Sequence, residues 1–473
     1  MDFPDPHMTQ PDLFAWNMER DPAMRSTIIS VLILDSEPDQ DCLIRTLERA
    51  ARVVPRLRHV LSTAPLALTP PRWVPDPDFD LSWHVRRFGL PPPADMSTVL
   101  EFARQECMEA FDPVRPLWRF TVLTGLSGGQ AAVVLKIHHS LTDGVGGILI
   151  AEQVLDSTRE GSTRAPADEP EQHLRGTLAD VVAWNSAAGL GLLRHSVIAA
   201  GSLLRRTMTD PVGLVRGGGA LTRSLARLTR PVISTLSPVM TARSTGRALA
   251  VLEVPLDELT AAARRAGCTV NDAYLTAVLI GVREYHRHHD ATVGHLRLTM
   301  PINVRSPDDP MGGNRVTLAR FAVPVDIDEV DELMRAVHAV AGRWRDEPSI
   351  GWSGTVAGVL NQLPTAVIAG MLEHVDFVAS NVPGSPIPLY LAGAQVEQIY
   401  AFGPTLGTAF NTLLLSHVGT YFLGIVVDSA AVPDLPVFAE SIASGFDSTL
   451  GAGGDTRSRS RVVVGSLSTR KSG

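Results

Sequence analysis

Long apolar runs and cysteines are scarce in this chain of 473 residues. No stretch reaches the roughly 18–20 uninterrupted apolar residues that a helix needs to cross a bilayer. The N-terminus, from Met1 to Asp5, lacks the charged and apolar regions of a signal peptide. The three cysteines, Cys42, Cys107 and Cys268, do not have the spacing of a disulfide framework. We therefore expect a cytoplasmic protein with reduced thiols.

An excess of positive charge is also missing. The chain carries 42 lysine and arginine residues against 50 aspartate and glutamate residues, a formal net charge of −8. This balance argues against nucleic acid as a partner, because phosphate backbones need a basic surface. With 45% hydrophobic and 19% charged residues, the composition is that of a globular protein with an unusually apolar balance. The length suffices for two domains with substantial cores.

Arginines nevertheless gather between Arg194 and Arg247, next to apolar stretches at 189–193 and 197–200. The combination gives this segment a basic amphipathic character, which can attract an anionic lipid or a phosphorylated ligand. The alternative is a solvated connector with one face packed on a domain. In both interpretations the segment connects two domains.

The most informative segment is His138-His139-Ser140-Leu141-Thr142-Asp143-Gly144, directly after an apolar run at 131–137 that predicts a buried strand. Side chains alternate along a strand, so His139 should share a face with Leu135 and Ile137 while His138 points the other way. Only one of the two histidines can then readily meet a substrate. An imidazole with a pKa of about 6.5 is mostly unprotonated at neutral pH and can accept a hydroxyl proton.

Two further residues can shape this loop. Asp143 can fold back to touch a histidine or to pair with an arginine, for which Arg305, Arg56 and Arg58 are candidates. Gly144 permits backbone angles or close approaches that a side chain would block. A metal site is not favoured, because adjacent histidines on a strand diverge and no further ligands accompany them at metal spacing. A serine hydrolase is not favoured, because we expect no strand-to-helix G-x-S-x-G elbow.

Five segments in order make the sequence resemble a known family. The H-H-x-x-x-D-G loop resembles the active-site motif of the CoA-dependent acyltransferase superfamily, which includes chloramphenicol acetyltransferase and peptide-synthetase condensation domains. From Pro11 to Pro436 the chain is more closely similar to the bacterial wax ester synthase/diacylglycerol acyltransferase family. The other four segments are Pro116-Leu117-Trp118, Asn271-Asp272, Pro301-Ile302-Asn303-Val304-Arg305 with Gly313-Asn314, and Ser380-Asn381-Val382-Pro383-Gly384.

The resemblance implies an α/β fold of two chloramphenicol-acetyltransferase-like domains, with a central tunnel and the histidine loop near its middle. It implies an O-acyltransferase that moves a long-chain acyl group from acyl-CoA directly to diacylglycerol or to a long-chain alcohol. His139 would be the general base, Asp143 would hold the loop and Gly144 would leave room for substrate. We expect acyl-CoA as a co-substrate, no cofactor and no metal. The candidate catalytic residues are His139, His138, Asp143 and Gly144, and the candidate substrate-binding or supporting residues are Pro116, Leu117, Trp118, Asn271, Asp272, Arg305, Ser380 and Asn381.

Three segments depart from the family's pattern. They are Met24-Arg25-Ser26 in place of Met-His-Val, Ser237-Pro238-Val239-Met240 without an asparagine, and Ser416-His417-Val418-Gly419 in place of Ser-Tyr-x-Gly. These departures bear on the acceptor and on turnover, and they leave the base intact.

Plainer structural roles compete with functional ones at three of the motifs. Trp118 fits a buried aromatic residue at the start of a strand. Asn271 and Asp272 open a helical pattern and fit a cap with a favourable charge in the first turn. Asn381 stands before Val382-Pro383-Gly384 and fits a turn.

The pattern of strands, helices and breaks predicts four parts. We expect an N-terminal acyltransferase domain at 1–160, a linker and basic amphipathic helical connector at 161–246, a C-terminal acyltransferase-like domain at 247–450, and a disordered tail at 451–473. The expected strands include 27–34, 131–137, 248–254 and 296–304, and the expected helices include 41–53, 148–155 and 256–266.

Two other hypotheses remain open at this point. A condensation-like acyltransferase would take its acyl group from a carrier protein, and a weakly catalytic lipid-binding protein would coat storage droplets. We expect the protein in the cytoplasm, with a peripheral position on the inner membrane or on lipid droplets as an additional expectation.

Overall fold

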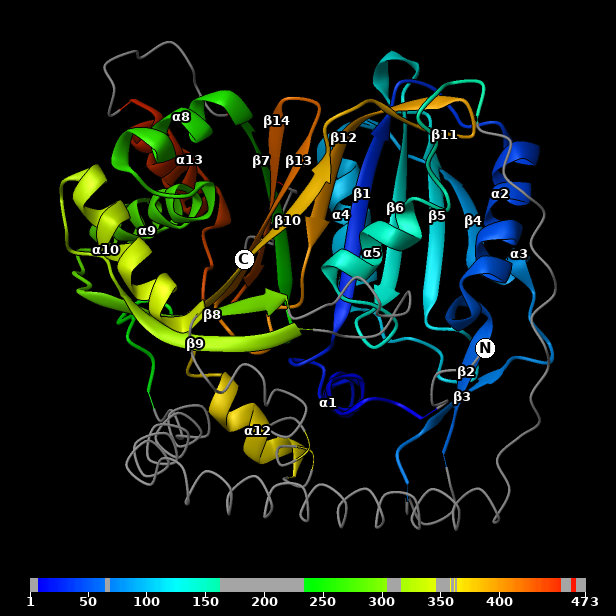
Figure 1. Ribbon diagram of the computed structural model, residues 1–473, viewed down its shortest axis with the longest axis horizontal. Helices are drawn as coiled ribbons and strands as arrows, with labels where there is room; N and C mark the ends of the chain where they lie inside the picture. The colour runs from blue at the N-terminus through cyan, green and yellow to red at the C-terminus, as the bar shows by residue number, and fades with distance from the viewer. Residues whose placement is uncertain are drawn as a thin grey trace, which may run out of the picture.

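The computed structural model describes residues 7–63, 69–161, 234–303, 316–345, 358, 361, 364–451 and 461–464. These residues form two α/β units that lie side by side, each built on one large sheet (Figure 1). The predicted α/β class with two related units is therefore confirmed. Most of the predicted connector at 161–246 lies outside the described residues, as do Arg305 and Gly313-Asn314.

The first sheet has six strands. In spatial order they are β11 (Leu389–Leu391), β12 (Ala394–Phe402), β1 (Thr27–Leu34), β6 (Ala131–His138), β5 (Trp118–Thr124) and β4 (Val85–Gly89). The central strand β1 alternates as a period of two requires. Ile29 and Val31 pack toward helix α4 (Met96–Met108), whereas Leu32 packs toward helix α2 (Gln40–Val53).

The second sheet has seven strands. Their spatial order is β15 (Arg461–Val464), β7 (Arg247–Pro255), β14 (Thr420–Asp428), β13 (Phe410–His417), β10 (Phe377–Ser385), β8 (His295–Asn303) and β9 (Val316–Pro324). Four helices cover the outer face of this sheet and bury its apolar side chains (Figure 1): α8 (Leu256–Ala266), α9 (Val270–His288), α10 (Val330–Arg345) and α13 (Leu435–Gly451).

Smaller elements fill the space around the sheets. They are α1 (Gln10–Met18), the 3-10 helix η1 (Pro55–Arg58), the hairpin strands β2 (His59–Ser62) and β3 (Arg72–Pro75), α3 (Leu81–His84), η3 (Ser127–Gly129), α5 (Gly144–Ala151) and α12 (Thr365–Leu372). Within the described ranges, no helix is both long enough and apolar enough to cross a membrane.

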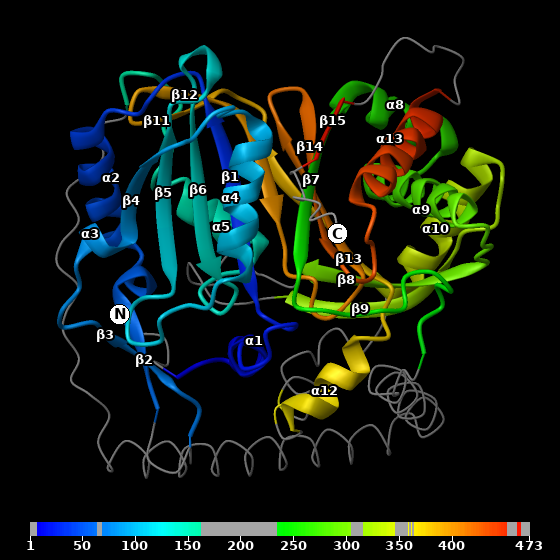
Figure 2. The same cartoon turned by 180° about the vertical axis from the view of Figure 1, so that it is seen from behind.

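Two predicted domain boundaries are wrong. Residues 389–402 were expected in the C-terminal domain, but β11 and β12 belong to the first sheet, where β12 runs antiparallel to β1. The expected disordered tail at 451–473 contains β15, which pairs with β7. In both cases a strand distant in sequence satisfies the backbone groups of what would otherwise be a sheet edge. Figure 2 shows β12 and β15 from behind.

Several local predictions are confirmed and one is displaced. The strand at 27–34 and the helix at 256–266 have the predicted bounds. The helix expected at 148–155 instead begins at Gly144 and ends at Ala151, because Asp143 caps it. The letters Gly125-Leu126-Ser127-Gly128-Gly129 do spell G-x-S-x-G, but they form the turn between the antiparallel strands β5 and β6 and not a strand-to-helix elbow.

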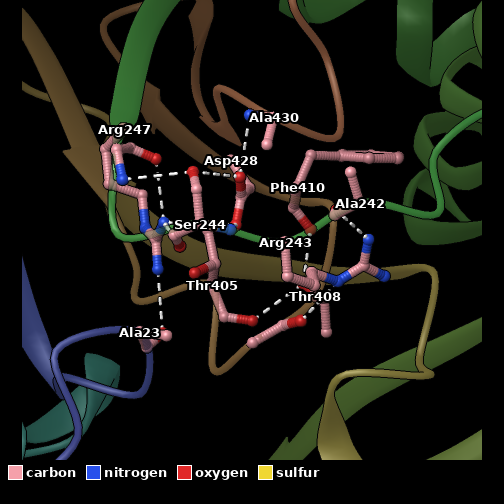
Figure 3. Close-up of polar contacts among 12 residues, drawn as sticks. Ala23, Ala242, Arg243, Ser244, Arg247, Thr405, Thr408, Phe410, Asp428 and Ala430 are labelled. Carbon is pink, nitrogen blue, oxygen red and sulfur yellow. Dashed lines mark hydrogen bonds and ion pairs between the residues drawn. The ribbon is translucent and has the colours of Figure 1, made fainter.

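Arg247, which forms a buried ion pair within the second unit, also donates a hydrogen bond to the first unit. Arg247 at the start of β7 lies 3.4 Å from the Asp428 carboxylate and donates to the Ala23 carbonyl at 2.8 Å, and both charged side chains are buried. Asp428 also accepts hydrogen bonds from the Ser244 hydroxyl and from the Ala430 N–H (Figure 3). The pair is charge-balanced and hydrogen-bonded, which is the condition under which buried charges are tolerated.

Candidate active site

The histidine loop begins where β6 ends. The His139 N–H donates to the Ser26 carbonyl at 2.8 Å, which fixes the loop to the strand next to β6. The side chains of Leu135, Ile137 and His139 line one cavity, as the alternation along the strand predicted. His139 therefore presents its imidazole to the interior space between the two sheets.

His138 lies on the opposite side of the strand and is fully buried. Its Nδ1 accepts a hydrogen bond from the Ser140 N–H at 3.1 Å, so its proton resides on Nε2. Nε2 lies 3.3 Å from the Glu19 carboxylate. The rings of Trp16 and Phe111 meet the imidazole edge to face at 5.7 and 5.6 Å. His138 thus holds the loop in place, and the two histidines divide into one structural and one cavity-facing residue.

Glu19 was not among the predicted site residues, and it connects both histidines. Its carboxylate accepts a hydrogen bond from the Ser26 N–H at 3.2 Å and contacts His138, while the Ser26 carbonyl holds His139. Glu19 caps the C-terminal end of α1, far from the loop in sequence. No local pattern marks such a residue, because its role depends on a long-range contact.

Asp143 is the N-cap of helix α5. Its Oδ1 accepts a hydrogen bond from the Gly146 N–H at 2.7 Å, and its side chain is buried. The expected role in holding the loop is consistent with this geometry. Of the proposed arginine partners, Arg56 pairs with Asp12 at 3.2 Å. It also donates a hydrogen bond to the Ser140 carbonyl at 3.1 Å, and this contact supports the histidine loop. Arg58 lies over the Phe79 ring.

Gly144 lies at the joint between the two units. A Cβ atom at this position would come within 3.0 Å of Val382 Cγ2 on β10. The histidine loop and the Ser380-Asn381-Val382-Pro383-Gly384 segment therefore pack against each other, and both line the cavity. Gly384 is even more constrained, since a Cβ there would lie 1.7 Å from the Ser416 carbonyl oxygen.

The cavity between the units has a volume of about 920 Å³ and mainly apolar walls. This volume lies at the upper end of the range for pockets that enclose small-molecule ligands. Both sheets contribute to its wall, from β1, β5, β6 and β12 on one side and from β8, β10 and β13 on the other. Among the described residues, the titratable side chains that line it are His139, Asp143, Glu152, Asp156 and Arg320. A long hydrocarbon chain is the kind of ligand that such a wall can bind.

The tryptophan motif supports the loop and also reaches the cavity. Pro116 and Leu117 are buried, and the Leu117 carbonyl accepts a hydrogen bond from the His138 N–H at 3.0 Å. Trp118 donates from its indole nitrogen to the Leu57 carbonyl at 2.7 Å and stacks on His84 with ring centroids 4.4 Å apart. Since Trp118 also lines the cavity, the buried-aromatic role and wall contact coexist.

The other two motifs differ in their relation to the cavity. Ser380 and Asn381 on β10 line it, whereas the described cavity wall includes neither Asn271 nor Asp272. The N-cap of helix α9 is Thr269, two residues before the predicted cap Asn271, and Thr269 forms a capping box with Asp272 in the first turn. The plainer structural role therefore holds for Asp272.

In the part of the chain that the structure describes, one group of three side chains has the spacing of metal ligands. Cys268, Asp272 and His338 have ligand atoms within 4.8 Å of one another. His338 Nδ1 lies 2.7 Å from Asp272 Oδ2, which also accepts the Thr269 N–H at 2.8 Å. A capping box and an ion pair account for this arrangement without a metal ion.

Comparisons with known proteins agree with the geometry. A family model described as the wax ester synthase/diacylglycerol acyltransferase catalytic domain matches residues 8–274, and the C-terminal domain model of the same family matches residues 312–449. A putative diacylglycerol O-acyltransferase of Mycobacterium tuberculosis is 33% identical over 461 residues, which cover 96% of this chain and 93% of that protein. A probable diacylglycerol O-acyltransferase of the same species is 27% identical over 86% of this chain and 87% of its own length.

Solved structures share the fold. The wax ester synthase/diacylglycerol acyltransferase of Marinobacter aquaeolei VT8 superposes with a TM-score of 0.63 at 22% identity, covering 94% of this chain and 99% of that chain. The starter condensation domain of rhizomide synthetase, in a complex with C8-CoA, superposes with a TM-score of 0.59 at 13% identity and covers 96% of this chain and 95% of that chain.

Proposed function

The chain belongs to the wax ester synthase/diacylglycerol acyltransferase family, and from this membership and the position of His139 we propose that it transfers a long-chain acyl group from acyl-CoA to diacylglycerol. A long-chain alcohol is the alternative acceptor within the same chemistry. The observation that carries the proposal is the His139 side chain in the wall of a large apolar cavity between the two units.

The proposed reaction needs no acyl-enzyme. His139 takes the proton from the acceptor hydroxyl as its oxygen attacks the thioester carbonyl carbon. The new C–O bond forms, the C–S bond breaks, and the proton passes from the imidazole to the leaving CoA thiolate. The ester and free CoA are the products. Asp143, Glu19 and His138 keep the loop in position and do not touch the reacting atoms.

The cavity walls support a long acyl chain as the group transferred. Each methylene group that leaves water contributes about 0.8 kcal/mol to binding. Apolar side chains that line the same cavity as His139 include Leu32, Ile137, Leu413 and Leu415. A chain of palmitoyl length would gain most from such a wall, whereas a short polar acyl group would leave it unfilled.

We also propose that the protein works in the cytoplasm at the surface of the membrane or of a lipid droplet, where its lipid substrates reside. Ile387 lines the cavity and is 50% exposed, so an apolar side chain borders the opening. On α12, Ile368 and Leu372 line the cavity while Val367 is 48% exposed. Co-sedimentation with vesicles containing diacylglycerol, compared with Ile387→Glu, tests this location; equal sedimentation of both proteins would contradict it.

The function is tested with the purified full-length chain, labelled palmitoyl-CoA, and either dioleoylglycerol or hexadecanol. We expect triacylglycerol formation, and we expect His139→Ala to lower its rate by about 10²–10⁴-fold, the usual contribution of a general base. His288→Ala is the matched control, because His288 is exposed near the end of α9, and it should retain the full rate.

Three outcomes would contradict the proposal. Transfer only from an acylated carrier protein would indicate a condensation-like enzyme. Vesicle binding without ester formation from either acceptor would indicate a lipid-binding protein. Full activity of a folded His139→Ala protein would remove the general base from the mechanism.

A further inference from the structure

Asn411 is a buried polar residue in an otherwise apolar part of the cavity wall. It is the second residue of β13 and is 3% exposed, and it lines the cavity beside Val378 and Leu413. Its Oδ1 atom has no hydrogen-bond partner in the structure as described. A buried amide oxygen is costly to leave unpaired, so such an atom indicates a donor that arrives with a ligand or a bound water.

The orientation of this amide is determined by its surroundings. Nδ2 donates to the Pro404 carbonyl at 2.7 Å, and since a carbonyl can only accept, the nitrogen must face Pro404 and the oxygen must face away. Gly403 leaves room for the amide, because a Cβ there would lie 2.8 Å from Asn411 Nδ2.

The loop that carries Pro404 is itself held in place. The Thr408 hydroxyl lies 2.7 Å from the Thr405 carbonyl and 2.9 Å from the Phe410 carbonyl, as the close-up of this loop shows (Figure 3). The unpaired oxygen is therefore a fixed feature of the wall and does not depend on a free rotation of the side chain.

Asn411 and His139 reach the cavity near the same end of the first sheet. Phe402, at the end of β12, pairs with Ile29 on β1, and the Ser26 carbonyl just before β1 accepts the His139 N–H. β12 and β6 flank β1, so two strand spacings, about 10 Å in all, separate the end of β12 from the end of β6. Asn411 itself extends from β13 of the second sheet, and the Pro404 carbonyl, just after β12, holds its amide on that side of the cavity.

We propose that Asn411 Oδ1 accepts a hydrogen bond from an amide N–H of the pantetheine arm of the acyl thioester. This inference rests on the proposed function. Diacylglycerol has one O–H group, which His139 engages, and its ester oxygens can only accept. The pantetheine arm has two amide N–H groups, three and seven bonds from the sulfur. An extended chain advances about 1.2 Å per bond, so these groups lie about 4 and 8 Å from the sulfur, a reach comparable with the spacing of about 10 Å between the end of β6 and the end of β12.

Replacing the amide by an isosteric apolar group tests the contact. Asn411→Leu removes the acceptor at nearly constant volume, and Leu414→Met is the matched control on the same strand, where Leu414 is buried in the core of the second unit and not in the cavity wall. We expect Asn411→Leu to lower kcat/KM for palmitoyl-CoA by about five- to tenfold through KM, the effect of one lost neutral hydrogen bond. The KM for dioleoylglycerol should not change, and the control should stay within twofold for both substrates.

A donor without amide groups separates recognition of pantetheine from a general effect on the wall. With S-ethyl thiopalmitate, Asn411→Leu and the unsubstituted protein should have the same kcat/KM. An equal loss with both donors would overturn the inference and indicate a structural role, because the variant would then impair the cavity and not a pantetheine contact. No loss with palmitoyl-CoA would overturn it as well and would indicate that a water molecule pairs with Oδ1.

A binding measurement distinguishes failure of this inference from failure of the proposed function. S-hexadecyl-CoA is a thioether that cannot transfer its chain, and calorimetry should show a five- to tenfold weaker Kd for Asn411→Leu. If this difference appears but the unsubstituted protein makes no ester, the proposed function fails while the pantetheine contact stands. If ester forms but the Kd values agree, the contact is refuted and the function stands.

Discussion

Glu19 allows the sharpest test of how the fold positions His139, the proposed general base. Its carboxylate accepts the Ser26 N–H at 3.2 Å and faces His138 Nε2 at 3.3 Å, and the carbonyl of the same Ser26 accepts the His139 N–H at 2.8 Å. Glu19→Ala would leave the buried Ser26 N–H without its acceptor and His138 without the carboxylate that it faces. A buried unpaired donor costs about 1–3 kcal/mol, so we predict a loss of about 1–3 kcal/mol in the free energy of unfolding.

The same change should slow the reaction without weakening substrate binding. A base displaced by about 1 Å can cost roughly 10²-fold in rate, so we predict a 10- to 100-fold lower kcat for Glu19→Ala with unchanged KM values. Glu19→Gln retains the size and one acceptor oxygen, and it should lose about 1 kcal/mol of stability and less than tenfold in kcat.

Transfer from palmitoyl-CoA to dioleoylglycerol and urea unfolding measure the two effects. Glu37→Gln is the matched control, since Glu37 pairs with Arg87 on the surface and such pairs contribute about 0–1 kcal/mol. An unchanged kcat in a folded Glu19→Ala protein would refute the positioning role. A raised KM with full kcat would assign Glu19 to substrate binding instead.

Three further predictions follow from other contacts. Gly384→Ala should lower the free energy of unfolding by about 3 kcal/mol or more, because its Cβ would lie 1.7 Å from the Ser416 oxygen, whereas Gly89→Ala meets nothing within 4 Å; urea titrations measure both. Burial and two nearby arginines lower the pKa of His59 to about 4, so below pH 6.5 the unfolded chain gains a proton that the folded chain does not. Stability should therefore fall by up to about 3 kcal/mol between pH 6.5 and 4, and His59→Gln should flatten this slope. Ala401→Phe narrows the cavity and should lower the palmitoyl-to-octanoyl ratio of kcat/KM at least tenfold, since each excluded methylene forfeits about 0.8 kcal/mol.

Each of these has a result that would contradict it. Equal unfolding midpoints for the two glycine variants would mean that β10 and β13 can separate at little cost. A pH slope that persists in His59→Gln would assign the acid sensitivity to other groups. An unchanged chain-length ratio in Ala401→Phe would mean that the acyl chain occupies another part of the cavity.

Local patterns predicted the elements whose determinants lie within a few residues. The bounds of β1 follow from a period of two, and those of α8 follow from helical spacing with a capped end. The opposite directions of the His138 and His139 side chains follow from strand alternation alone. The predicted start of α5 is wrong because its first turn contains three glycines, and the low helix propensity of glycine favours a loop there. The Asp143 cap and the close packing of Gly144 on β10 outweigh that preference.

The amino-acid sequence by itself determined the position of the histidine loop, the side of the strand from which His139 reaches the cavity, and the family resemblance, because these depend on residue types at short spacing. Only the tertiary structure decided that β12 joins the first sheet, that Glu19 supports both histidines and that the Asn411 oxygen is left unpaired in the cavity wall. The reason is physical: each of these features depends on how segments distant along the chain pack against one another, and this packing exists only in the folded protein.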